Sequence, residues 1–226
     1  MSATRIDDAA GFLIGTLGIR ARSRPRWRRA LSAISVILAL VGAGMLSYPV
    51  ITNIYSSNQQ GKLAADFISP NLKARFDAGG VLDGQVLVRI VIPKIGVNAL
   101  IVEGTDAGAL RAGAGHYKGT AMPCTAGNTA IAGHRTTYGK PFNRIDELSV
   151  GDEIRLITPE KSCTYKVVAG PPGKPKPHQG SAGWVTTPND GSVIGPTPSG
   201  ALTLTTCHPK GSAAKRLIVR AESVAA

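Results

Sequence analysis

The hydrophobic positions of the chain form one long segment near the N-terminus and several short runs after it. No charged residue occurs from Ala30 to Gly61, and residues 31–51 read LSAISVILALVGAGMLSYPVI. A helix of about 20 apolar residues is long enough to cross the hydrocarbon core of a bilayer. The pattern therefore predicts a single transmembrane anchor within residues 30–55.

Basic residues are distributed unevenly around this segment. Six arginines lie between residues 20 and 29, whereas Lys62 is the only basic residue among the 20 that follow Ile51. Because basic flanks stay in the cytoplasm, we expect a single-pass cell-membrane protein with a cytoplasmic N-terminus and an extracytoplasmic C-terminal domain. A cleaved signal peptide is the alternative, since Gly42, Ala43 and Gly44 are small enough for a processing site. The apolar run continues past them to Ile51, which favours a retained anchor.

Composition divides the rest of the chain. Residues 1–29 are Arg-rich and polar without periodicity, which predicts a disordered cytoplasmic tail. Residues 56–85 mix small and polar residues with a weakly amphipathic stretch, a pattern typical of a stalk or linker with a short helix. We expect the folded domain to occupy residues 86–226, which is long enough to bury one core.

The pattern of the folded domain is β-like. Short runs rich in Val, Ile, Leu and Thr, such as VLVRIVIPKI, DEIRLIT and ALTLTTC, are separated by clusters of Gly, Pro, Asn and Asp. About seven or eight short strands without long helices predict a closed barrel or a sandwich. Residues 170–200 are dense in Pro and Gly. Because a long irregular segment inside a compact domain is usually functional, we expect it to form a wall or lid of a site.

The formal net charge of +12 is compatible with an anionic partner, which would be either nucleic acid or the membrane and cell-wall polymers. It is also compatible with a basic surface that is simply solvated. Aromatic residues make up only 5% of the chain. No RNP-like, zinc-finger or helix-turn-helix pattern accompanies the basic residues, so we expect no nucleic-acid binding.

One of the three cysteines stands where a nucleophile would be presented. Cys207 follows the alternating run Ala201 to Thr206, at a strand end. A nucleophilic cysteine needs a base or cation nearby and a group that stabilises an oxyanion. The candidates are His116, His134, His178, His208 and Arg216. An odd cysteine count leaves at least one thiol free, and Cys124 and Cys163 either pair or remain separate buried thiols.

Four segments resemble the sortase family. TLTTCHP at residues 203–209 resembles the Thr-Leu-X-Thr-Cys signature, and its His-Pro continuation is similar to actinobacterial class E members. NTAIAGHRTTYGKPFNRIDEL at 128–148 resembles the histidine segment, GAGHYKGTAMP at 113–123 the stretch before it, and KRLIVRAE at 215–222 the arginine strand. The order of histidine, cysteine and arginine is also that of the family.

This resemblance implies a mainly β fold, an eight-stranded sortase-type barrel with short helices, and a cysteine transpeptidase without cofactor or metal. Cys207 would attack the threonine carbonyl of a Leu-Pro-X-Thr-Gly or Leu-Ala-X-Thr-Gly sorting signal. His134 would protonate the departing amine and accept a proton from the incoming one. Arg216 would hold the oxyanion or the substrate backbone.

The resemblance also implies softer assignments. Thr205 and Thr206 would line the groove beside the substrate threonine, or simply fill the strand. His116 and Tyr117 resemble a pair near the groove, where the tyrosine hydroxyl would favour Ala over Pro in the signal. His208 would tune the thiolate, or set the turn with Pro209. The implied partners are surface proteins with a C-terminal sorting signal and an amine of peptidoglycan or its precursor.

Other hypotheses fit the sequence less well. In papain-like proteases the cysteine precedes the histidine, and L,D-transpeptidases use a Ser-His-Gly-Cys context that this chain lacks. Within the family, pilin polymerisation is the alternative. The non-enzymatic alternative is a membrane-tethered β-module whose Cys207, His208 and His134 bind a metal such as zinc or merely pack. No Cys-X-X-Cys pair supports that site.

Overall fold

The computed structural model describes residues 25–78 and 80–224. It divides into two compact units, residues 1–45 and 46–226. The helix α1 (Arg26–Phe67) begins in the first unit and ends in the second. Among the described residues it is the one helix that is long and apolar enough to cross a membrane. None of its most apolar stretch is buried in the protein. Most of the tail expected over residues 1–29 lies outside the described residues.

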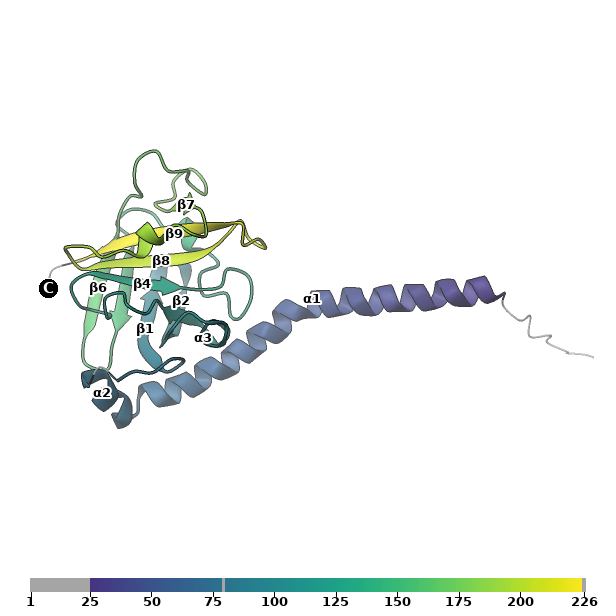
Figure 1. Cartoon of the computed structure of the whole chain (residues 1–226), viewed down its shortest axis with the longest axis horizontal. Helices are drawn as coiled ribbons and strands as arrows, with labels where there is room; N and C mark the ends of the chain where they lie inside the picture. Colours follow the sequence, from purple (N-terminus) through teal and green to yellow (C-terminus); the bar gives the residue numbers. More distant parts are fainter. Residues whose placement is uncertain (1–24, 79, 225–226) are drawn as a thin grey trace, which may run out of the picture. The chain divides into compact units, whose positions relative to one another are not determined.

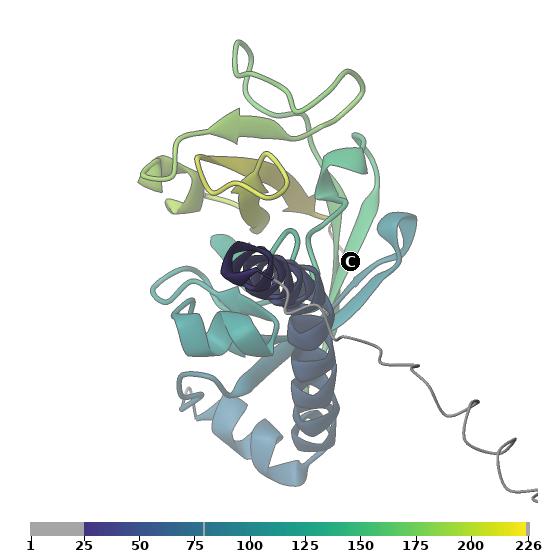
Figure 2. The same cartoon turned by 90° about the vertical axis from the view of Figure 1, so that its right-hand side faces the viewer.

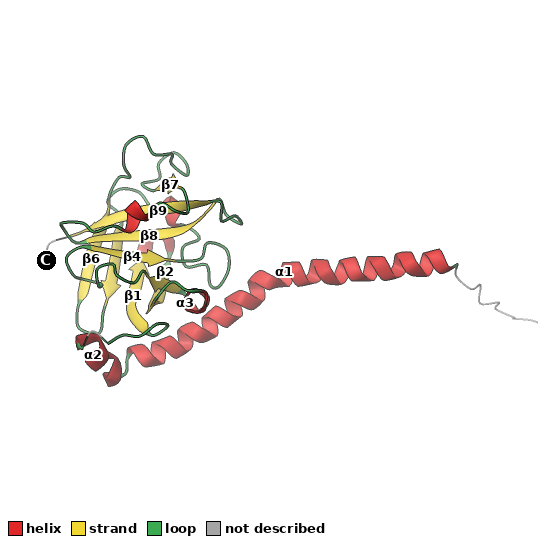
Figure 3. Ribbon diagram, viewed as in Figure 1, coloured by secondary structure: helices red, strands yellow, loops and turns green. Residues whose placement is uncertain are grey.

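Eight strands close into a barrel in the order β6-β5-β1-β2-β3-β4-β8-β9, and β6 pairs again with β9 (Figures 1 and 3). A further strand, β7, pairs with β9 outside this ring. The expected eight-stranded barrel is therefore confirmed. The strands are β1 (Val86–Ile92), β2 (Val97–Glu103), β3 (Ala114–His116), β4 (Asn128–Ala132), β5 (Glu153–Ile157), β6 (Ser162–Val167), β7 (Trp184–Thr186), β8 (Ala201–His208) and β9 (Lys215–Ser223).

Short helical segments connect the strands. The Asp106 side chain caps α3 by accepting hydrogen bonds from the main-chain nitrogens of Gly108 at 2.7 Å and Ala109 at 3.2 Å. The segment 170–200 is irregular apart from β7 and one 3-10 turn, because its prolines and glycines interrupt regular pairing. The short helices are α2 (Pro70–Asp77), α3 (Ala107–Ala112), η1 (Pro93–Ile95), η2 (Ile145–Glu147) and η3 (Gly191–Ile194).

Parallel pairing of β4 with β8 sets the position of the site. Ala132, at the end of β4, lies opposite Thr205, near the end of β8. Parallel strands finish at the same edge of a sheet, so the residues that follow them emerge side by side. His134 and Cys207 are the chemically reactive residues at these two ends.

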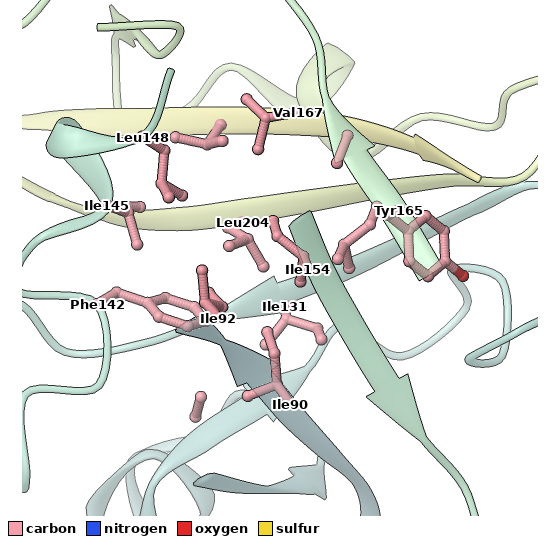
Figure 4. Close-up of a cluster of buried hydrophobic side chains, with 14 of the residues drawn as sticks. Ile90, Ile92, Ile131, Phe142, Ile145, Leu148, Ile154, Tyr165, Val167 and Leu204 are labelled. Carbon is pink, nitrogen blue, oxygen red and sulfur yellow. The ribbon is translucent and has the colours of Figure 1, made fainter. Parts of the chain in front are cut away.

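Side chains from most strands meet inside the barrel, as Figure 4 shows for labelled residues such as Ile90, Ile131, Leu204 and Tyr165. Phe142 joins this core from the loop after β4. A Cβ atom at Gly133 would lie 2.5 Å from the Phe142 ring, so only glycine permits this approach. The loop after His134 is thereby fixed to the core.

The residues before β1 pack on the barrel. Leu72 of α2 is buried with Val86 and Leu100, and side chains at the end of α1 pack against them. Figure 2 shows the end of α1 leading into α2 at the bottom of the view. The side-chain amide of Gln60 accepts from the main-chain nitrogen of Leu100 at 2.8 Å and donates to its oxygen at 3.0 Å. Residues 46–226 belong to one compact unit, in which β1 begins at Val86.

A disulfide joins Cys124, in the connection between β3 and β4, to Cys163 on β6, with their Cα atoms 5.6 Å apart. The sequence left open whether these two cysteines pair or remain separate buried thiols, and in the structure they form a disulfide. Cys207 is the free cysteine.

Candidate active site

Cys207 and Arg216 are directly opposite partners in the antiparallel pair of β8 and β9. Side chains of such partners project to the same face of the sheet. Both residues are half-buried. The guanidinium of Arg216 donates from Nη1 to the main-chain oxygens of Ala213 at 2.9 Å and Lys215 at 3.1 Å. A fixed cation thus lies on the same side of the barrel end as the thiol.

His134 is attached to β8 through the residue before it. The nitrogen of Gly133 donates to the oxygen of Thr205 at 3.0 Å, and the hydroxyl of Thr206 donates to the oxygen of Gly133 at 2.7 Å. The His134 ring packs against Tyr138, with ring centroids 5.0 Å apart and planes 37° apart. Burial lowers the pKa of His134 below its ordinary value. Its imidazole is therefore neutral at pH 7, as a general base must be.

A buried ion pair lies behind these residues. Arg135 is 4% exposed, and its Nη2 lies 2.9 Å from Oδ2 of Asp146. Its Nη1 donates to the main-chain oxygen of Cys207 at 3.3 Å and to Nδ1 of His208 at 3.1 Å. The side chain directly after His134 thus holds the strand end that carries the cysteine.

The environment of His208 follows from this ion pair. Burial, followed by the charge of Arg135, lowers the pKa of His208. Because Nδ1 accepts a hydrogen bond from Arg135, this ring is neutral with its proton on Nε2. His208 therefore adds no positive charge beside the thiol at pH 7.

A groove of about 190 Å³ borders the site. Tyr117, Thr205, Arg216 and Ile218 line one part of it, and residues 186–191, 193 and 194 line the rest. The hydroxyls of Tyr117 and Thr205 are 3.0 Å apart. Asp190 holds the opposite wall by accepting from the hydroxyl of Thr186 at 2.5 Å. The Pro-Gly-rich segment therefore forms a wall of this groove.

A model of the Sortase domain matches residues 90–224. The chain belongs to the sortase family. Sortase SrtE1 of Streptomyces coelicolor is 31% identical over an alignment 226 positions long, which covers 89% of this chain and 61% of that protein. The chain spans less than two thirds of the length of the curated relatives that it matches.

Solved sortases share the fold. A sortase D5 transpeptidase from Clostridium perfringens is 28% identical, with a TM-score of 0.61, over 76% of this chain and 99% of that one. Sortase E1 from Streptomyces coelicolor, solved with a tripeptide in the active site, is 35% identical with a TM-score of 0.53. That match covers 63% of this chain and 90% of that one. The resemblance to class E sortases is thus confirmed.

The structure brings only some of the predicted substrate residues of this sortase to the groove. Tyr117 and Thr205 line it, whereas Thr206, which is as buried as Thr205, does not line it and donates a hydrogen bond to the oxygen of Gly133. His116 is also buried, with Nδ1 2.8 Å from Oε2 of Glu103 and Nε2 2.9 Å from the hydroxyl of Thr120. His116 therefore orders the strands beneath the groove and does not reach its surface.

Arg135 and Asp146 were not predicted as site residues. Both occur inside the histidine segment, but a charged residue in such a segment is usually solvent-exposed. Within residues 25–78 and 80–224, no group of three or more His, Cys, Asp or Glu side chains is placed to hold a metal ion. The metal-binding β-module has no support in this part of the chain.

Proposed function

We propose that this sortase is a membrane-anchored cysteine transpeptidase that joins surface proteins to an amine of peptidoglycan or its precursor. Its substrate is a C-terminal sorting signal of the Leu-Ala-X-Thr-Gly or Leu-Pro-X-Thr-Gly type. Cys207, His134 and Arg216 carry the reaction. The observation that supports this most directly is that the paired Cys207 and Arg216 and the neutral His134 lie at the same barrel end.

In the first half-reaction, the thiol proton of Cys207 passes to His134, and the thiolate sulfur forms a bond with the threonine carbonyl carbon. The carbonyl oxygen becomes an oxyanion, which the guanidinium of Arg216 stabilises. His134 then donates its proton to the glycine nitrogen as the Thr-Gly bond breaks. The products are a thioacyl enzyme and a free glycine amine.

In the second half-reaction, His134 takes a proton from the acceptor amine while the amine nitrogen attacks the thioacyl carbon. The carbon–sulfur bond breaks, and Cys207 recovers its proton through His134. A new amide bond then links the surface protein to the acceptor. Neutral His134 is suited to this step because a protonated imidazole could not accept the proton.

The groove suits an extended peptide as the donor. Its walls present the hydroxyls of Tyr117 and Thr205 beside Arg216. A hydroxyl pair at this position favours a signal whose second residue can form a hydrogen bond with one of the two hydroxyls. We therefore propose a preference for Ala over Pro at that residue. The tripeptide in the active site of sortase E1 from Streptomyces coelicolor supports a peptide ligand here.

The location at the membrane rests on α1. Its apolar window is unburied, and arginines precede the apolar segment. A helix of this kind is stable in a bilayer, with the basic flank in the cytoplasm. The catalytic barrel would then lie outside the membrane, where it meets both the exported protein and the cell wall.

The test uses the full chain in detergent, because residues of α1 pack on the barrel. Peptides carrying each signal are incubated with the enzyme and an amine, and products are identified by mass spectrometry. Cleavage between Thr and Gly with capture of the amine, absent in Cys207→Ala, is the expected result. A folded enzyme with a free thiol that cleaves neither peptide would contradict the proposal. Capture of a pilin lysine in preference to a stem-peptide amine would instead indicate pilin polymerisation.

A further inference from the structure

A second cavity, of about 500 Å³, has Tyr138, the ring neighbour of His134, in its lining. Its walls come from α1, from the turn between β1 and β2 with the start of β2, from the residue before β3, and from the loop after β4. The lining residues are 53, 56, 57, 60, 95–99, 113, 138–141, 143 and 144. It shares no lining residue with the groove that contains Arg216. Cavities of this volume hold ligands the size of a short peptide. We call it the α1 cavity.

Tyr138 connects the α1 cavity to the catalytic histidine. Its side chain lines the cavity, and its ring packs on the ring of His134, with the centroids 5.0 Å apart. A ligand in the α1 cavity therefore lies one side chain away from His134.

The wall formed by Tyr138 is held in place by α1. Positive φ angles occur at three consecutive residues, 49° at Tyr138, 73° at Gly139 and 42° at Lys140. This left-handed backbone conformation is unfavourable for residues other than glycine. The side-chain oxygen of Asn53 accepts from the nitrogen of Gly139 at 2.9 Å. A Cβ atom at Gly139 would lie 2.9 Å from the hydroxyl oxygen of Ser56. Contacts with α1 thus fix a strained loop whose shape defines the cavity.

When the acceptor arrives, the acyl fragment of the donor is still bound to Cys207, and the acceptor amine attacks the thioacyl carbon from the side that the glycine has left, next to His134. The groove beside Arg216 accommodates the donor peptide, so the acceptor needs another route. Its amine must pass His134, which removes its proton. We infer that the α1 cavity binds the amine acceptor, an inference that rests on the proposed function and adds to it the site of the second substrate.

The lining of the cavity indicates the chemistry of that acceptor. No Asp or Glu lines it, whereas Lys140 and Arg144 do. Arg144 is paired with Glu147 at 2.6 Å, and Lys140 is exposed. Among the described residues, no hydrogen bond or ion pair is found for the side-chain amine of Lys140, although its main chain bonds to Thr137 and Asn143. The cavity therefore offers one available cation beside the amides and hydroxyls of Asn53, Ser57 and Asn98.

Such a lining suits a short peptide that carries a carboxylate beside its reacting amine. Lys140 would attract the carboxylate, and the polar side chains would bond to the peptide groups. The same positive charge disfavours an ammonium group and so favours the neutral, nucleophilic form of the amine. An acceptor of this class is bound by its acid group while its amine is kept ready for His134.

The test compares two acceptors that differ in one group. The first acceptor, acetyl-alanyl-diaminopimelate, has a carboxylate next to its free amine. The second is the same compound with that carboxylate replaced by a carboxamide. Three proteins are compared: the wild-type full chain, Lys140→Gln and the control Lys161→Gln. Lys161 is exposed and lies outside the cavity. Each protein is incubated with a sorting-signal peptide and increasing concentrations of the acceptor. The measured quantity is the ratio of amine capture to hydrolysis.

We expect the wild-type enzyme and Lys161→Gln to prefer the carboxylate acceptor by about three- to fivefold, as an exposed charge pair allows. Lys140→Gln should lose this preference. A wild-type enzyme without preference, or a preference retained in Lys140→Gln, would overturn the inference. If no donor is cleaved even without acceptor, the proposed function itself fails.

A second variant tests the cavity without relying on charge. Ser57 is exposed on α1 and lines the cavity, so Ser57→Trp narrows it without disturbing the core. The acceptor concentration that gives half-maximal capture should rise for both acceptors. An unchanged concentration would show that the acceptor does not enter through the α1 cavity.

Discussion

The guanidinium of Arg135 donates a hydrogen bond of 3.3 Å to the main-chain oxygen of Cys207. Arg135 immediately follows His134, so one buried side chain connects the segments that carry the proposed base and nucleophile. Its charge is balanced by Asp146 at 2.9 Å. Because a buried charge is costly without its partner, this ion pair supports the geometry of the site.

Loss of the partner of Arg135 should destabilise the barrel. Asp146→Ala leaves the guanidinium buried and uncompensated, which we expect to lower the free energy of unfolding by about 3 kcal/mol. Urea unfolding followed by tryptophan fluorescence measures the change. The neighbouring variant Glu147→Ala is the control, since it removes an exposed ion pair with Arg144 and should change little. Equal effects of the two variants would contradict a structural role for the buried pair.

The titration of His134 provides a second prediction. Burial lowers its pKa, so the ring should titrate below about 6.5 when followed by NMR in a histidine-labelled Cys207→Ala variant, which removes coupling to the thiol. His134→Gln assigns the signal. A midpoint above 6.5 in Cys207→Ala would contradict the burial seen at this position.

The same shift makes stability depend on pH. A lowered pKa means that, just below about pH 6.5, the unfolded chain binds a proton at this histidine more readily than the folded chain does. The contribution of His134 is therefore complete above that pH and is lost as the pH falls through the lowered folded-state pKa. His208, whose pKa is also lowered, acts in the same direction. In His134→Gln, the loss of unfolding free energy on acidification should be smaller than in the wild type, and an equal loss would count against this account.

The disulfide should stabilise the barrel without serving the chemistry. Cys124 and Cys163 are 39 residues apart in sequence, so opening the loop should cost about 4 kcal/mol in the chain-entropy account. The Cys124→Ala, Cys163→Ala double variant should unfold at lower urea but keep peptide cleavage at low temperature. Loss of cleavage in a variant that remains folded would show that the bridge also shapes the site.

The hydroxyl pair of Tyr117 and Thr205 should influence the choice of signal. Tyr117→Phe removes one partner of the 3.0 Å contact, and we expect the preference for Leu-Ala-X-Thr-Gly over Leu-Pro-X-Thr-Gly to fall about fivefold in kcat/KM. Thr205→Val should have a similar effect. If the pair acts as a unit, the double variant should lose no more than either single one. Fully additive losses would mean that the two hydroxyls act separately.

Local sequence predicted the strands and the three proposed catalytic residues because both depend on short segments. The run before Cys207 alternates as a strand does, and the histidine and arginine stand in recognisable segments. The closed ring, with β6 returning to β9, followed from the resemblance to the family. The position of each strand end then follows from the topology.

Other features depend on contacts between distant segments. Burial of His116 requires Glu103 on a neighbouring strand, and burial of Arg135 requires Asp146 beyond a loop. The packing of α1 on the barrel depends on Gln60 meeting Leu100. A weakly amphipathic pattern resembles a stalk unless the surface that covers it is known, so neither this packing nor the α1 cavity could be predicted.

The proposed reaction requires that Cys207 is acylated by the threonine of a sorting signal. The full chain is mixed with a signal peptide without acceptor, quenched in acid within the first turnover, and measured by intact and peptide mass spectrometry. We expect an adduct with the mass of the peptide fragment that ends in Thr, located on the segment that contains Cys207 and absent from Cys207→Ala. Cleavage of the peptide that persists in Cys207→Ala, or an adduct on another residue, would contradict the proposed reaction.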